Sequence, residues 1–166
     1  MIVKKYNTDQ VHPDQYKGAD FYEDHDIFDS HKFISTGNSG TFELRTLIFK
    51  EKGADKNDAY ELGFGKWNPE TKKLDDLFET NNEDVDEILA TVAGKALEFL
   101  KKHPQARIFA TGSTPGRTRL YQRQIGKNLD NIPDSLRIQG VSIKTKLGWS
   151  DFQKGINYDA FLLSAK

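Results

Sequence analysis

The residues best suited to chemistry lie close together between Gly112 and Arg123, where a short apolar run is followed by hydroxyl and basic side chains. Thr114 is a residue type preferred at a helix N-cap, and the proline after it suits the first helical position. The first backbone N–H groups of a helix lack partners within it, and the helix dipole favours an anion there. Ser113 and Arg117 add side-chain donors at the same place. The pattern predicts a site for a phosphate, sulfate or carboxylate group.

The predicted anion site consists of the loop and the first turns of the helix after it: Gly112, Ser113, Thr114, Gly116, Arg117, Arg119, Tyr121 and Arg123. It is neither a Walker loop nor a dinucleotide fingerprint, because the Gly-Lys-Ser/Thr sequence and the glycine spacing are both absent. Thr-Pro-Gly is also an ordinary way to begin a helix, and Arg117 has the alternative of pairing with a nearby carboxylate. The sequence therefore leaves a purely structural role open.

A helical projection separates the basic side chains of this segment into two groups. At about 100° per residue, Arg119, Arg123 and Lys127 fall in a row nearly opposite the apolar row, whereas Arg117 lies near the edge of the core. A basic row contacts phosphate backbones in some proteins and is simply a solvated face in others, and both readings stay open. An arginine at the margin of a core usually has a fixed partner.

Composition excludes several classes of site. The chain has 166 residues, a formal net charge of -1 and no cysteine. Disulfides, thiolate catalysis and cysteine-based zinc sites are therefore excluded, and overall charge argues neither for nor against nucleic acid. The spacing of the four histidines matches no metal site, so we expect no metal and no cofactor. The sequence has neither a signal-peptide pattern nor an apolar run long enough to cross a bilayer, so we expect a cytoplasmic protein without a membrane partner.

Apolar periodicity predicts a single α+β domain over 1–166, with a mostly antiparallel sheet, a meander first and then β-α-β-α-β-β, and two helices packed on one face. The expected strands cover 1–6, 31–37, 41–50, 59–67, 74–79, 107–111, 137–144 and 158–164, and the expected helices cover 83–102 and 114–129. Thr80 and Glu83 have the spacing of a capping box at the first helix. Residues 7–30 are polar with scattered aromatics, and we expect them to form a long loop or arm.

Three segments of the chain resemble an uncharacterised family of small bacterial proteins, a domain of unknown function. They are 111–121 (TGSTPGRTRLY), 89–93 (LATVA) and 155–161 (GINYDAF). The resemblance runs over about 32–166 and leaves the segment 7–30 outside. Family members commonly have alanine where this chain has Gly116, which weakens the start of the helix slightly. The resemblance implies the fold and a bacterial cytoplasmic origin, and it marks six residues of the predicted anion site without giving their role.

The sequence supports three hypotheses about function. The first is a binding protein for a phosphate-bearing ligand, nucleic acid or a nucleotide, held at the helix start by Arg117 and extended by Arg119 and Arg123. The second is a small toxin-like enzyme acting on RNA or a nucleotide, with Tyr121 as acid or nucleophile, although the sequence shows no positioned general base. The third is a protein–protein interaction module, in which the anion is a partner's carboxylate. Catalytic residues and oligomeric state stay unknown at this level.

Overall fold

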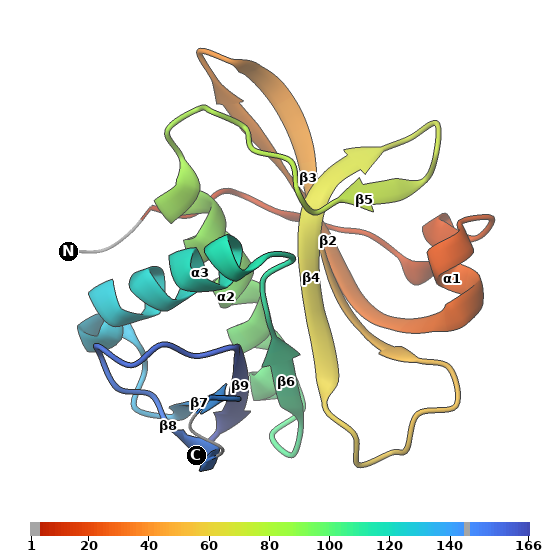
Figure 1. Ribbon diagram of the computed structural model, residues 1–166. Helices are drawn as coiled ribbons and strands as arrows, with labels where there is room; N and C mark the ends of the chain where they lie inside the picture. Colours follow the sequence, from red (N-terminus) through yellow and green to blue (C-terminus); the bar gives the residue numbers. More distant parts are fainter. Residues whose placement is uncertain (1–3, 145–146) are drawn as a thin grey trace.

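The computed structural model describes residues 4–144 and 147–166, and within these ranges nine strands form one large, mostly antiparallel sheet (Figure 1). The strand order is β1-β2-β3-β4-β6-β9-β7-β8, and β5 pairs with β4 outside this path. β4 and β6 run parallel to each other, and the other paired strands run antiparallel. The predicted α+β class is thereby confirmed.

The strands are β1 (Asp9–Gln10), β2 (His25–Gly37), β3 (Gly40–Glu51), β4 (Tyr60–Asn68), β5 (Lys73–Asp75), β6 (Arg107–Ala110), β7 (Leu136–Ser142), β8 (Leu147–Asp151) and β9 (Ala160–Ala165). The helices are α1 (Asp20–Asp24), α2 (Val85–Lys102) and α3 (Pro115–Lys127), with short 3-10 turns η1 (Pro13–Tyr16) and η2 (Leu129–Asn131). Of the strand expected at 1–6, residues 1–3 lie outside the described residues and residues 4–6 form no strand, so this prediction is wrong for the part that is described. β8 was not predicted.

The hairpin of β2 and β3 is the longest paired unit and confirms the turn predicted between residues 37 and 40. The two strands pair in register from His25 opposite Glu51 to Gly37 opposite Gly40, with one irregularity. Gly40 has φ of +133°, a backbone conformation that favours glycine. β2 begins six residues before the predicted strand. The sheet therefore extends further than predicted, into the end of the N-terminal segment.

The segment 7–30, expected to be a loop or arm, is ordered, and this prediction is wrong. It contains β1, η1, α1 and the start of β2. Val11 and Tyr16 are almost fully buried and pack with Leu47 of β3. The Tyr16 hydroxyl also shares a hydrogen bond of 2.7 Å with the Ser30 hydroxyl. The apolar residues of this segment are few and follow no regular period, so sequence periodicity does not reveal that they cover one face of the sheet.

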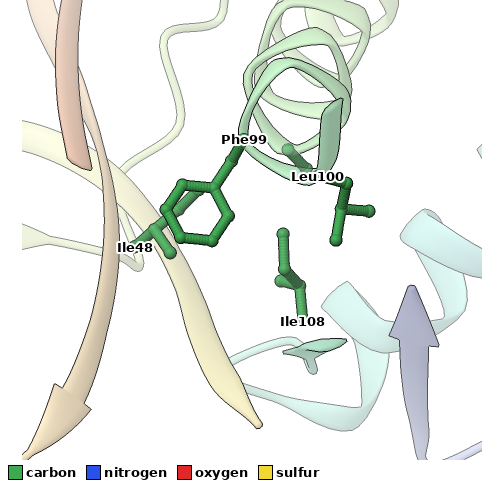
Figure 2. Close-up of a cluster of buried hydrophobic side chains, with 5 residues drawn as sticks. Ile48, Phe99, Leu100 and Ile108 are labelled. Atoms are coloured by element: carbon green, nitrogen blue, oxygen red, sulfur yellow. The ribbon is translucent and has the colours of Figure 1, made fainter. Parts of the chain in front are cut away.

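Helix α2 packs on the opposite face through side chains at three- and four-residue spacing. Phe99 and Leu100 join Ile48 of β3 and Ile108 of β6 in a buried cluster (Figure 2). The helix predicted over 83–102 is therefore confirmed to within two residues. α3 lies on the same side as α2, as predicted, whereas the short α1 belongs to the N-terminal segment on the other face.

The predicted capping box at the start of α2 is wrong, because Asp84 is the N-cap residue and Glu83 has φ of +58°. The buried Asp84 carboxylate instead accepts hydrogen bonds from the hydroxyl groups of Tyr6, Ser35 and Thr80. Burial alone would raise the pKa of Asp84, but these three hydrogen bonds outweigh it and hold the pKa below its ordinary value. The carboxylate thereby links the N-terminal segment, β2 and the start of α2.

Replacing Asp84 with asparagine is expected to lower the free energy of unfolding by roughly 2–3 kcal/mol at pH 7, because hydrogen bonds to a charged acceptor are lost in a buried site. The folded-state pKa of Asp84 lies below its unfolded value, so the stabilisation is complete above the unfolded pKa and is lost as pH falls through the folded pKa. Urea unfolding at pH 7 and in acid measures both effects. The difference between the native chain and D84N should shrink in acid, and an equal difference at every pH would contradict this account.

Candidate functional site

The loop between β6 and α3 has the geometry predicted for a capped helix start. β6 ends at Ala110, and α3 begins at Pro115 with Thr114 as its N-cap. The Thr114 hydroxyl accepts a hydrogen bond of 3.2 Å from the backbone N–H of Arg117. One of the unpartnered amides expected at this helix start is therefore already satisfied by a side chain.

Gly112 packs directly against the first turn of α3. A Cβ atom at this position would lie 2.4 Å from the backbone nitrogen of Thr118, so only glycine fits without displacing backbone. The Gly112 N–H donates to the Thr118 hydroxyl at 3.0 Å. A Cβ at Gly116, in contrast, would meet its nearest atom at 3.8 Å, so the alanine expected in relatives has room there. Gly112 thus has a packing role that the sequence did not indicate.

Arg117 and Arg119 are bound to backbone carbonyl groups rather than to carboxylates. The Arg117 guanidinium donates to the carbonyl oxygen of Leu77 and, at 3.5 Å, to that of Phe78. Arg119 donates to the carbonyl oxygen of Tyr158 at 2.5 Å. Within the described residues neither guanidinium forms an ion pair. Each guanidinium is therefore held by backbone carbonyls and is not neutralised by an ion pair with a described residue.

The basic row predicted on the outer face of α3 is interrupted. Arg119 is half-buried at its carbonyl partner, and Lys127 forms an ion pair of 3.4 Å with Asp86 of α2. Arg123 is exposed and has no hydrogen bond or ion pair with another described residue. The predicted solvent-facing row is therefore confirmed for Arg123 and Lys127 and wrong for Arg119, which is half-buried at its carbonyl partner.

The two motifs that carry the sequence resemblance contact each other. Gln122, one residue after 111–121, accepts a hydrogen bond of 2.8 Å from the Tyr158 N–H. Its amide nitrogen donates to the Asn157 side chain at 3.2 Å, and the Thr111 hydroxyl donates to the Asp159 carbonyl at 2.9 Å. Together with Arg119 these contacts dock α3 onto the start of β9. The sequence analysis placed both motifs but did not predict their contact.

A cavity of about 640 Å³ lies between α2, α3 and the sheet. Its walls are mostly apolar and include the following side chains from both helices and from β4 and β9: Leu89, Ala93, Leu97, Ile125, Phe64 and Leu163. This cavity was not predicted from the sequence. The small residues on one side of α2, among them Ala90, Ala93 and Gly94, are the signal that could have indicated it, because they leave space beside the helix.

Polar groups of the predicted anion site lie at one end of this cavity. Of the predicted residues, Gly112, Ser113 and Tyr121 line it, together with Thr111 and with Asp76 from the segment after β5. The other five predicted residues do not line it: Thr114, Gly116, Arg117, Arg119 and Arg123. Burial raises the pKa of the Tyr121 hydroxyl above its ordinary value; the Arg117 guanidinium opposes this shift, and Asp76 adds to it. The phenol is therefore protonated at neutral pH, which fits a hydrogen-bond donor better than the nucleophile considered from sequence.

The described ranges 4–144 and 147–166 contain neither a helix that could span a membrane nor a side-chain group that could hold a metal ion. None of the helices there combines the length and apolar character that a membrane crossing requires. No group of three or more histidine, cysteine, aspartate and glutamate side chains in these ranges is arranged to hold a metal ion.

Comparison with known proteins identifies the family. Residues 15–166 match the model of DUF6934, a family of unknown function, and the chain belongs to this family. No curated protein and no solved structure matches the chain. The family match begins at residue 15, so most of the segment 7–30, which the sequence resemblance left outside, lies within the family.

Proposed function

We propose that this member of the DUF6934 family binds a small phosphate-bearing ligand, such as a nucleotide, at the end of the cavity formed by the loop 111–113 and the start of α3. The apolar part of the ligand enters the cavity, and its negative group lies beside Ser113 and Arg117. One observation carries this proposal: the Arg117 guanidinium is held by backbone carbonyls, forms no ion pair with a described residue and acts on Tyr121, which lines the polar part of an apolar cavity. In this proposal the protein acts in the cytoplasm of a bacterium.

Backbone contacts hold Arg117 and Arg119 in position. Backbone carbonyls fix both guanidinium groups in position but carry no net charge, so each keeps its positive charge without an ion pair to a described residue; near Tyr121 the Asp76 carboxylate offsets part of the Arg117 charge. The helix dipole adds positive potential at the start of α3. Side chains that are already fixed in place lose little conformational entropy when a ligand binds, so the free energy of binding is more favourable.

The shape of the cavity favours a small ligand over a polymer. Small-molecule sites typically measure about 300–1,000 Å³ and combine apolar walls with a few polar groups that orient the ligand. The cavity has this volume and composition. On α3, Arg123 is exposed and has no hydrogen bond or ion pair with another described residue, and one arginine is a weak basis for binding a nucleic acid backbone.

Replacing Ser113 with glutamate tests the proposal, because it places a negative charge at the end of the cavity without removing a structural arginine. Ser113 is exposed, and its hydroxyl makes only a long contact of 3.4 Å with the Asp76 carbonyl. We expect calorimetry to show binding of AMP by the native chain and a loss of about tenfold or more in S113E, since 1.4 kcal/mol of repulsion changes an equilibrium tenfold. Ser150→Glu on β8 is the matched control, because Ser150 is exposed and does not line the cavity.

Three results would contradict the proposal. The first is an absence of AMP binding by the native chain, and the second is equal affinity in S113E and S150E. The third is binding of single-stranded oligonucleotides that is lost in Arg123→Ala while AMP does not compete, which would move the ligand to the outer face of α3.

A further inference from the structure

The sheet contains an opening at its one parallel pair of strands. Among the described residues, β4 and β6 pair only where Tyr60 lies opposite Ile108 and Glu61 opposite Phe109. Beyond these positions β4 continues toward Asn68, whereas β6 ends at Ala110 and the chain turns into α3. Residues 62–64 of β4 and the loop 111–113 both line the cavity, so the cavity reaches into this opening.

The opening presents hydrogen-bonding groups of the backbone to the cavity. Alternate residues of a strand direct their N–H and C=O groups to opposite sides. One side of β4 pairs with β3 along residues 61–66, and the other side has no strand partner between the β6 pairs and the β5 pairs, which begin at Lys66. Part of the β4 backbone therefore faces the cavity with donors and acceptors at fixed positions.

Two polar side chains of cavity-lining residues form no hydrogen bond or ion pair with another residue that the structure describes. The Asp76 carboxylate lines the cavity near Tyr121 and forms no hydrogen bond or ion pair with another described residue. The Gln124 side-chain amide also lines the cavity, and only its backbone carbonyl has a partner, the Asn128 side chain and amide. A carboxylate accepts hydrogen bonds, and an amide both donates and accepts.

Aromatic rings form the wall next to these groups. Phe64 of β4 and Tyr121 of α3 contact each other with ring centroids 5.8 Å apart, and both line the cavity. The small Ala93 of α2 also lines the cavity. Planar ring systems such as nucleic acid bases stack favourably on aromatic side chains.

We propose that the cavity takes a planar heteroaromatic base with an exocyclic amino group, so that the ligand is a nucleoside phosphate. The base packs against Phe64 and Tyr121, its amino group donates to the Asp76 carboxylate, and its ring edge bonds with Gln124 and the free side of β4. This inference rests on the proposed function for the position of the phosphate. It makes Asp76 the residue that selects among bases.

Calorimetric titration with four probes separates the two proposals: AMP, adenosine, ribose 5-phosphate and inorganic phosphate. We expect AMP to bind most tightly, adenosine and ribose 5-phosphate each to bind at least about tenfold more weakly, and inorganic phosphate to bind weakest. In Asp76→Asn we expect the affinity for AMP to fall about tenfold, while that for inosine monophosphate, which has a carbonyl in place of the amino group, is unchanged or improves. Asp134→Asn is the matched control, because Asp134 is exposed outside the cavity.

The outcomes distinguish failure of this inference from failure of the proposed function. Equal binding of AMP and ribose 5-phosphate would overturn the inference and leave the phosphate site standing. Equal binding of AMP and adenosine would overturn the phosphate site and leave the base site standing. Equal loss of AMP and inosine monophosphate in D76N would remove the selective role of Asp76, and no binding of any probe would overturn both proposals.

Discussion

Replacing Gly140 with alanine is expected to lower the free energy of unfolding by about 3 kcal/mol, at the upper end of the usual cost of overpacking a core. A Cβ at Gly140 would lie 2.3 Å from the Tyr158 ring. This ring cannot move away easily, because Tyr158 is 2% exposed and its hydroxyl accepts a hydrogen bond from the Gln153 N–H. The backbone of Tyr158 binds Arg119 and Gln122, so a shifted ring also loosens the docking of α3.

Gly148→Ala on the neighbouring strand is the matched control. A Cβ at Gly148 would have no atom within 4 Å, so this change is expected to leave stability unchanged or to raise it slightly. Urea unfolding followed by circular dichroism compares both variants with the native chain. A G140A protein as stable as G148A would show that the Tyr158 ring does not occupy the space above Gly140.

Replacing Ala93 with tryptophan is expected to weaken ligand binding about a hundredfold or more. Ala93 is exposed on α2 and lines the cavity, so the larger ring has room to enter it from the helix without displacing the buried core. The tryptophan ring would occupy the cavity space beside Phe64 and Tyr121. A ligand that has to displace this ring loses the contacts made there, and a loss of 2.7 kcal/mol weakens binding about a hundredfold. AMP titration measures the affinity.

Lys102→Trp controls for the effect of an added tryptophan on α2, because Lys102 is exposed at the end of the helix and does not line the cavity. Both variants should keep the circular dichroism spectrum of the native chain. Unchanged affinity in A93W with an intact fold would place the ligand outside the cavity.

The parts of the fold that sequence predicted well are those with a strong local signal. The apolar period of α2 and the Thr114-Pro115 start of α3 depend on neighbouring residues only, and the structure confirms both. The N-terminal segment was predicted wrongly, because Val11 and Tyr16 are buried by contacts with the distant β3 rather than by a periodic pattern of their own. The capping box failed for a related reason: Asp84 binds Tyr6 and Ser35, which are far away along the chain.

The candidate site shows the same limit. Sequence placed Arg117 at the margin of the core with a fixed partner, and the structure agrees, but the partners are backbone carbonyls of Leu77 and Phe78, which no residue pattern reveals. The cavity depends on the separation of two helices that are adjacent only in space. Gly112 was assigned to an anion, whereas its lack of a side chain is already required by the first turn of α3.

The most direct test of the account is an NMR titration of ¹⁵N-labelled protein with AMP, because it reports where a ligand contacts the backbone. The account predicts that the largest amide shifts occur at Gly112 and Ser113 and at Gly63 on the facing edge of β4, the residues where the loop and the sheet opening line the cavity. Shifts confined to the exposed face of α3 around Arg123, or no shifts at millimolar AMP, would contradict it.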